Sequence, residues 1–208
     1  MPHFDLEHAA GGLVAGIDEA GRGPWAGPVV AVAAVIIDPA RLPDGIDDSK
    51  KLSKKRREAL FDPIMASAYI GVGQASPGEI DEFNILAATM LAMRRALDDL
   101  VAQHQIQPEF ALIDGNRVPG DLPCPARAVV KGDATSLSIA AASIVAKVTR
   151  DRIMTTLDED FPGYGWARNA GYGTPEHQAG LARLGVTSHH RTTYGPIRRL
   201  LHTSQLDS

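Results

Sequence analysis

The stretch GIDEAGRGP, from Gly16 to Pro24, decides the fold. It joins two apolar runs rich in valine and isoleucine, Leu13 to Asp18 and Pro28 to Ile37. Such a pattern predicts a buried strand, a glycine-hinged connection and a second buried strand. We therefore expect a sheet whose first two strands flank the glycine-rich loop.

Two consecutive carboxylates, Asp18 and Glu19, stand at the end of the first expected strand. Neighbouring residues of a strand point to opposite faces of the sheet. We therefore expect the two acids to share a site only if the chain leaves extended geometry there. Gly21 and Gly23, which have no Cβ atoms, would make that easy.

Outward from this stretch, strand and helix patterns alternate along the chain. The expected elements are a helix capped by Ser53 and running to about Ala68, a strand at Tyr69 to Ala75, an amphipathic helix from Ile80 to Val101, short strands at Phe110 to Asp114 and Ala128 to Lys131, a long helix from Ala134 to about Glu159 stopped by Pro162, a helix from Thr174 to Gly185 and one from Pro196 to His202. This order predicts an α/β fold, a mixed sheet with helices on its faces. We expect one catalytic domain at 1–160 and a helical segment at 161–208 packed on it.

Composition supports a packed soluble protein. The chain has 208 residues, 44% of them hydrophobic, and no apolar run long enough to span a bilayer. Its first twelve residues lack a signal-peptide pattern. Cys124 is the only cysteine, which excludes an internal disulfide and a cysteine-rich zinc site. We expect a cytoplasmic protein that does not contact membranes.

Charge is unevenly distributed. The formal net charge is −4, yet Lys50 to Arg57 reads KKLSKKRR, and residues 177–206 hold four arginines and no acid. An acidic body with two basic patches could hold cations in one place and phosphates in another. The alternative is that both runs are ordinary solvated helix faces.

Four acids fall near the expected strand ends: Asp18, Glu19, Asp114 and Asp133. Some have simpler explanations, because Asp133 could cap the helix starting at Ala134 and Asp114 begins an Asp-Gly turn. Those explanations leave four gathered acids without a compensating histidine or lysine cluster. Such carboxylates repel one another unless cations neutralise them, and oxygen ligands suit Mg²⁺ or Mn²⁺. Two such ions, roughly 4 Å apart, can hydrolyse a phosphodiester.

Six motifs occur in one order along the chain: GIDEAGRGP (Gly16 to Pro24), DSKKLS (Asp48 to Ser53), NILAAT (Asn84 to Thr89), IDGN (Ile113 to Asn116), KGDATSLSIAAASIVAKVTRD (Lys131 to Asp151) and GYGTPEH (Gly171 to His177). Together they resemble bacterial ribonuclease HII, over about Gly16 to Pro196. The resemblance implies the ribonuclease H-like fold, with a mixed five-stranded sheet flanked by helices and a C-terminal helical segment.

The resemblance also implies roles for individual residues. The metal-binding and catalytic tetrad would be Asp18, Glu19, Asp114 and Asp133. The loop whose backbone recognises the ribose 2′-OH would be Gly21, Arg22 and Gly23, and Tyr172 would pack on the neighbouring deoxyribose. Phosphate contacts would come from Lys50, Lys51, Lys147, Arg150 and Arg191. Arg22 has an alternative role, a salt bridge to Glu19 that supports the loop.

The implied activity is that of an endonuclease with two Mg²⁺ or Mn²⁺ ions. It would hydrolyse the RNA strand of RNA–DNA hybrids and cut 5′ to single ribonucleotides in duplex DNA, leaving 5′-phosphate and 3′-hydroxyl ends. That places it in ribonucleotide excision during DNA replication and repair. The expected partner is the nucleic acid alone, bound by a monomer.

Three features depart from the family pattern. Trp25 replaces a smaller apolar residue, and Ala170 stands where lysine is frequent. The tail from Arg199 to Ser208 lacks an aromatic pair of the kind that docks on sliding clamps, so we expect no protein partner.

Three other functions stay open on the sequence alone. One is a two-metal nuclease of the same fold with another substrate, such as a junction resolvase. The second is a non-catalytic nucleic-acid-binding module that uses the basic segments. The third is a histidine-based ribonuclease using His189 and His190, whose product would be a 2′,3′-cyclic phosphate.

Overall fold

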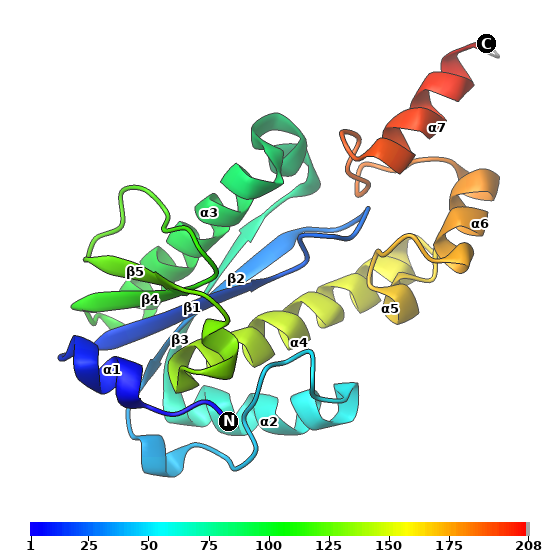
Figure 1. The fold of residues 1–208 in the computed structure, drawn as a ribbon. Coiled ribbons are helices and arrows are strands. Elements are labelled where there is room, and N and C mark those ends of the chain that lie inside the picture. Colours follow the sequence, from blue (N-terminus) through cyan, green and yellow to red (C-terminus); the bar gives the residue numbers. More distant parts are fainter. Residues whose placement is uncertain (207–208) are drawn as a thin grey trace.

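The computed structural model describes residues 1–206 and has a five-stranded mixed sheet at its centre (Figure 1). The strands lie in the order β3-β2-β1-β4-β5. Their bounds are β1 (Val14–Ala20), β2 (Val29–Ile36), β3 (Ala68–Ala75), β4 (Phe110–Asp114) and β5 (Ala126–Val129). The expected mixed five-stranded sheet is therefore confirmed.

Strand pairing leaves one edge of β1 open. β1 pairs antiparallel with β2 as far as Ala20, opposite Val30. Its parallel pairing with β4 ends earlier, at Ile17 opposite Ile113. The last residues of β1 therefore have a neighbouring strand on one side only.

Two helices sandwich the sheet. α3 (Pro77–His104) packs on one face of β1, β2 and β3, while α4 (Leu137–Asp160) crosses the other face with α2 (Lys54–Ser67) beside it (Figure 1). Glycines allow the close approach. A Cβ on Gly16 would lie 2.3 Å from the backbone of Ser138 in α4, and one on Gly71 would lie 2.2 Å from the carbonyl oxygen of Ala96 in α3.

The segment before α4 differs from the expectation. α4 begins at Leu137 with Ser136 as its cap, because the Ser136 hydroxyl accepts from the backbone N–H of Ile139 at 3.2 Å. Asp133 instead lies in a short 3₁₀ turn, η2 (Gly132–Ala134), and makes no capping bond. The strand β5 also stops earlier than expected, since Lys131 adopts a left-handed conformation with φ of 56°.

α3 is interrupted near its start. Asn84 has φ of 68° and ψ of 163°, and its side-chain oxygen accepts from the N–H groups of Leu86 and Ala87. The residue thus caps the longer part of α3 from inside the helix. The short elements α1 (Asp5–Ala10) and η1 (Pro39–Arg41) were not expected, although Asp38 caps η1 and Pro39 begins it.

The C-terminal segment forms three helices beyond one end of the sheet, α5 (Trp166–Asn169), α6 (Pro175–Leu184) and α7 (Gly195–Leu206) (Figure 1). A separate apolar cluster joins them to α4 and to the β1–β2 loop, and its buried members are Ala26, Met154, Tyr164, Trp166, Leu181 and Ile197. The expected division into a catalytic domain at 1–160 and a helical segment at 161–208 stays a prediction. Residues 207–208 of that segment lie outside the described part of the chain. Within 1–206, no helix combines the length and apolarity needed to cross a membrane.

Candidate active site

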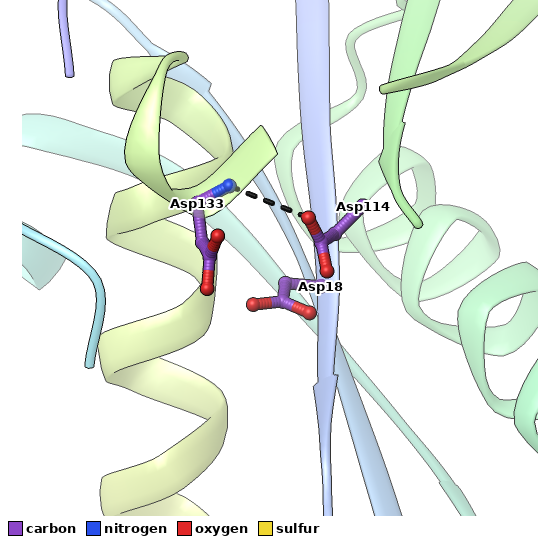
Figure 2. Close-up of side chains that lie close together, drawn as sticks. All are labelled: Asp18, Asp114 and Asp133. Atoms are coloured by element: carbon purple, nitrogen blue, oxygen red, sulfur yellow. Dashed lines mark hydrogen bonds between the residues drawn. The ribbon is translucent and has the colours of Figure 1, made fainter. Parts of the chain in front are cut away.

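Three aspartates from three elements meet beside the open edge of β1. Asp18 comes from β1, Asp114 ends β4 and Asp133 lies in η2 (Figure 2). One carboxylate oxygen from each can be chosen so that all three atoms lie within 4.8 Å of one another. Asp18 and Asp133 are buried, and Asp114 is half-buried.

Asp114 also holds η2 in place. Its Oδ1 accepts from the N–H of Gly132 at 2.7 Å and from that of Asp133 at 3.4 Å. Figure 2 shows the bond from Asp133. Gly115, with φ of 98°, then turns the chain away. The two sequence interpretations of Asp-Gly are therefore compatible, because one residue both begins a turn and faces the other acids.

Glu19 lies next to this group but not in it. Its N–H donates to Asp18 Oδ1 at 2.7 Å, and its Oε1 accepts from Arg22 Nη1 at 3.4 Å. The expectation that the chain must leave extended geometry is wrong, because β1 continues to Ala20. Both acids still line one cavity of about 270 Å³, since β4 no longer covers this edge of β1.

The acids raise one another's proton affinity. Burial raises the pKa of Asp18 well above its usual value, and repulsion by Glu19 and Asp114 adds to the rise. Burial likewise raises the pKa of Glu19 and of Asp133, with Asp114 contributing to both. A divalent cation would relieve this repulsion, so the donor set fits Mg²⁺ or Mn²⁺.

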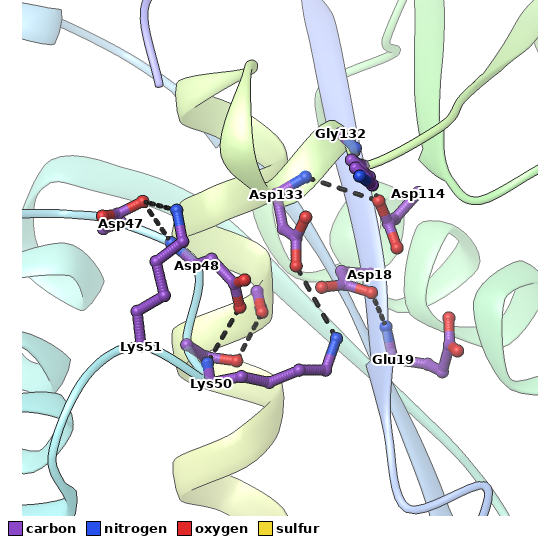
Figure 3. Close-up of polar contacts among 12 residues, drawn as sticks. Asp18, Glu19, Asp47, Asp48, Lys50, Lys51, Asp114, Gly132 and Asp133 are labelled. Atoms are coloured by element: carbon purple, nitrogen blue, oxygen red, sulfur yellow. Dashed lines mark hydrogen bonds and ion pairs between the residues drawn. The ribbon is translucent and has the colours of Figure 1, made fainter. Parts of the chain in front are cut away.

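Two basic side chains partly compensate the acids, contrary to the expectation from sequence. Lys50 Nζ lies 3.7 Å from Asp133 Oδ2, although the lysine side chain is 82% exposed (Figure 3). Burial lowers the pKa of Lys50, but Asp18 and Asp133 outweigh it, so the pKa is raised. Arg22 pairs with Glu19 as its alternative role requires. Lys51 instead pairs with Asp47 at 3.2 Å, away from the acids (Figure 3).

The glycine-arginine-glycine loop and Tyr172 adjoin the acids in the same cavity. The tyrosine ring lies against Gly23, where an added Cβ would come within 3.3 Å of Cε1. Gly21 has φ of 98°, and a Cβ there would lie 1.9 Å from Arg150 Nε. The Tyr172 side chain is otherwise half exposed, so it can meet a ligand.

Arg150 is buried and faces the backbone of this loop and of the Tyr172 loop. Its guanidinium donates to the carbonyl oxygens of Pro28 at 2.9 Å, Ala170 at 2.9 Å and Ala26 at 3.1 Å. Burial lowers its pKa to about 10. Because its Nε, Nη1 and Nη2 atoms all bond to carbonyls, we correct the expected phosphate contact: Arg150 supports the loops.

Arg191 requires the same correction. It is fully buried and donates to the carbonyl oxygens of Gly27, Gly21 and Arg22, the last at 2.9 Å. Its Nη1 also donates to the hydroxyl of Tyr194 at 3.0 Å. The tail thus reaches back to fix the backbone of the glycine loop. Lys147, which pairs with Asp151 at 2.7 Å, is the remaining basic residue expected to bind phosphate and lines the cavity.

Sequence reasoning missed residues that shape the site. Ser143 lies beside Asp18 and shares a hydroxyl–hydroxyl hydrogen bond of 2.7 Å with Ser49. Arg57 lines the cavity and donates to the carbonyl oxygen of Ser49 at 2.8 Å, which fixes the backbone next to Lys50. The two serines stand inside the quoted motifs, and that position was the only signal available.

Comparisons with known proteins place this chain among similar sequences and folds. The family model described as Ribonuclease HII matches residues 15–196. A protein named Ribonuclease HII from Jannaschia sp. is 57% identical over 200 residues, covering 96% of this chain and 98% of the relative. Another, from Paramagnetospirillum magneticum, is 58% identical and covers 97% and 99%. The solved ribonuclease H2 of Pyrococcus horikoshii superposes with a TM-score of 0.76 at 30% identity, covering 92% of this chain and 98% of that one.

Proposed function

The chain belongs to the ribonuclease HII family, and from this premise we propose that it cuts on the 5′ side of single ribonucleotides in duplex DNA as well as along RNA–DNA hybrids. Family membership makes it a metal-dependent endonuclease that degrades RNA paired with DNA. One observation carries the finer proposal: three aspartates within 4.8 Å of one another share a cavity with a glycine loop and a half-exposed tyrosine.

Asp18, Asp114 and Asp133 would hold the metal, and Glu19, which lines the same cavity, would join them. When bound, two divalent cations supply an activated water and stabilise the leaving oxygen of the phosphodiester. Asp114 Oδ1 is tied to the Gly132 backbone, which orients its second oxygen toward the other acids. The acids therefore meet the cations preorganised rather than mobile.

Lys50 and Lys147 would add positive charge to that of the cations, where the phosphates of the substrate bind. Lys50 lies beside Asp133 yet is mostly exposed, so its ammonium can turn to a phosphate oxygen of the substrate. Lys147 lines the cavity and is paired with Asp151. We propose that these two lysines, rather than the buried arginines, contact the substrate backbone.

Ribose would be read by the loop from Gly21 to Gly23. The carbonyl oxygens of Gly21 and Arg22 already accept hydrogen bonds from Arg191. The loop's backbone N–H groups are therefore the ones we expect to donate to the 2′-oxygen, which distinguishes RNA from DNA. The Tyr172 ring, resting against Gly23, would cover the next sugar.

The rival functions fit less well. His190 is buried among aromatic rings and lies outside the cavity that the acids line, which does not suit a histidine-based ribonuclease. The repelling acids do not suit a module that only holds phosphates. Action in the cytoplasm, as a monomer and without a protein partner, stays a prediction.

One assay tests the proposal. Three duplexes are incubated with the protein and Mg²⁺ or Mn²⁺, with and without EDTA: all DNA, DNA with one ribonucleotide, and an RNA–DNA hybrid. We expect cleavage of the last two only, sensitive to EDTA, with 5′-phosphate and 3′-hydroxyl ends. Cyclic phosphate ends, or an intact single-ribonucleotide duplex, would refute it. Preferential cleavage of a four-way DNA junction would favour the resolvase.

A further inference from the structure

Two buried histidines next to the Tyr172 loop have no part in the proposed chemistry. His177 lies in α6 and His190 in the segment between α6 and α7, and they are 0% and 1% exposed. Their Nε2 atoms lie 3.0 Å apart. Trp166 Nε1 lies 3.1 Å from the same Nε2 atom of His177.

The neighbours of each ring determine where its proton sits. The indole N–H of Trp166 can only donate, so His177 Nε2 must accept and the proton of His177 is on Nδ1. The backbone N–H of Thr187 donates to His190 Nδ1 at 3.0 Å, so the proton of His190 is on Nε2 and also points to His177 Nε2. With both rings neutral, Trp166 Nε1–H and His190 Nε2–H share the single lone pair of His177 Nε2. Burial lowers the pKa of both histidines, that of His190 to about 4.

This arrangement leaves one donor, His177 Nδ1–H, and it points out of the cluster. It lies 3.0 Å from the carbonyl oxygen of Tyr172. The same carbonyl accepts from Thr174 N–H at 2.8 Å, and the Tyr172 N–H donates to Asn169. The backbone of Tyr172 is therefore held firmly, while its ring contacts Gly23 and solvent.

Trp25 links the same cluster to the glycine loop. Its ring lies 5.9 Å from that of His177 between centroids, and a Cβ on Gly173 would come within 2.1 Å of it. Its backbone N–H donates to the carbonyl oxygen of Gly171 at 2.8 Å. The departure at position 25 thus places a large side chain beneath the tyrosine loop, which leaves that loop little freedom to move.

We propose that His177 is a positioning residue for substrate discrimination, because its Nδ1–H fixes the Tyr172 carbonyl and so sets where the tyrosine ring stands over the glycine loop. The inference rests on the proposed function, since it assumes that Tyr172 covers the sugar beside the ribonucleotide. His190 and Trp166 act one step further away, by fixing the tautomer of His177. A purely structural His177 would change stability and would affect all substrates alike.

Two substitutions separate these roles, because each amide mimics a different ring nitrogen. His177→Gln places its amide near Nε2, where its oxygen can accept from Trp166 and His190 while the donor to Tyr172 is lost. His177→Asn places its amide near Nδ1, where its N–H can still donate to Tyr172 while the cluster loses its acceptor. A structural role predicts that discrimination follows stability in both variants. Our inference predicts that discrimination and stability change independently in the two variants.

The measurement is kcat/KM on a duplex with one ribonucleotide divided by kcat/KM on a long hybrid, together with Tm. For His177→Gln we expect this ratio to fall about 3- to 10-fold, the scale of one hydrogen bond, with a small change in Tm. For His177→Asn we expect a lower Tm and a ratio close to that of the wild type. An unchanged ratio in His177→Gln, or a ratio that follows Tm in both variants, would overturn the inference.

Two further measurements complete the test. In a Tyr172→Ala background His177→Gln should lower the ratio no further, because it acts through the tyrosine; an additive loss contradicts this. In the wild type, ¹⁵N NMR should show neutral His177 with its proton on Nδ1, and an imidazolium or the other tautomer would refute the inference even if a variant does not fold. A wild-type protein that leaves the single-ribonucleotide duplex intact would instead refute the proposed function.

Discussion

At the scale of single residues, Asp114 has two tasks, and they can be separated. One oxygen accepts from the backbone of Gly132, and the carboxylate as a whole repels Asp18 and Glu19. An asparagine could still accept from Gly132 while removing the charge. The bond that shapes η2 would survive, and the metal site would lose a ligand.

We therefore predict that Asp114→Asn lowers kcat on hybrids by a hundredfold or more, about the loss expected when a preorganised charge is removed from an active site. The metal-free variant should melt at a higher temperature than metal-free wild type, because a source of repulsion is gone. Mg²⁺ should raise the Tm of the wild type more than that of the variant. Asp47→Asn, an aspartate outside the group, is the matched control. Near wild-type activity at millimolar Mg²⁺ would show that the site is misassigned.

Ala170 shows strain at another single residue. It ends α5 with φ of 50° and ψ of 32°, a left-handed conformation that costs a residue with a Cβ roughly 1–2 kcal/mol. Ala170→Gly should stabilise the protein by about 0.5–1 kcal/mol, since glycine's larger unfolded-state entropy offsets part of the gain. The midpoint of urea unfolding at unchanged slope measures it. Ala167→Gly, inside the same helix, should have the opposite sign.

At the scale of elements, one arginine of the tail has a different role from the one its charge suggests. The tail's arginines and lack of acids predict a phosphate-binding surface. In the structure, Arg191 is buried and fixes the glycine loop, and Asp81 in α3 holds the adjacent Thr192 and Thr193. Arg191 therefore supports the glycine loop, whereas Arg183, Arg198 and Arg199 are exposed. Composition alone could not distinguish the buried arginine from the exposed ones.

Asp81 makes this tether testable. Its carboxylate accepts from the backbone N–H and the hydroxyl of both threonines, at 2.6 to 2.9 Å. Burial raises its pKa, but these hydrogen bonds outweigh burial and lower it. The stability they contribute is therefore present above the usual carboxyl pKa and is lost as the pH falls through the lowered one.

We predict that Asp81→Asn destabilises the protein by about 1 kcal/mol near pH 7, a value reduced for partial exposure. KM on single-ribonucleotide duplexes should rise several-fold, because Arg191 loses its support. Asp98→Asn, on the same helix and paired only loosely with Arg94, should change neither. The measurement is urea unfolding at pH values from 7 to 3. The difference in the free energy of unfolding between wild type and Asp81→Asn should become smaller in acid. A difference that stays constant would show that the charge is not involved.

How far the sequence predicts this molecule depends on the range of the interaction. The sheet and its main helices follow from local patterns of apolar residues. The place of Asp114 and Asp133 in the site follows from their position next to a glycine near the end of an expected strand. The start of α4 was missed because Asp133 and Ser136 are both good capping residues, and only the distant Asp114 decides between them. The bond from His177 to Tyr172 depends on ring orientation inside a buried cluster, which no local pattern encodes.

At the scale of the whole molecule, the proposed selection of a lone ribonucleotide draws on six parts of the chain. The acids come from β1, β4 and η2, the glycine loop follows β1, and Tyr172 comes from the tail. Arg150 of α4 donates to the carbonyl oxygens of Pro28, just before β2, and of Ala170, near Tyr172. A Cβ on Gly23 would meet the tyrosine ring at 3.3 Å, so the ring packs directly on the loop. A sugar covered by that ring would be crowded by an added 2′-OH.

We therefore predict cleavage just before the last ribonucleotide of a four-ribonucleotide tract, where the next sugar is deoxyribose. Tyr172→Ala should lower kcat/KM on a single-ribonucleotide duplex far more than it lowers metal affinity, and Gly23→Ala should lower both rate and ribose selectivity because its Cβ displaces the ring. Each lost sugar contact should cost on the order of 1–3 kcal/mol. The measurement is kcat/KM and the cleavage position on single-ribonucleotide and four-ribonucleotide duplexes for wild type and both variants. If the wild type cuts at random along the tract and Tyr172→Ala slows both substrates equally, the loop and the tyrosine do not sense the junction, and selectivity must come from elsewhere in the cavity.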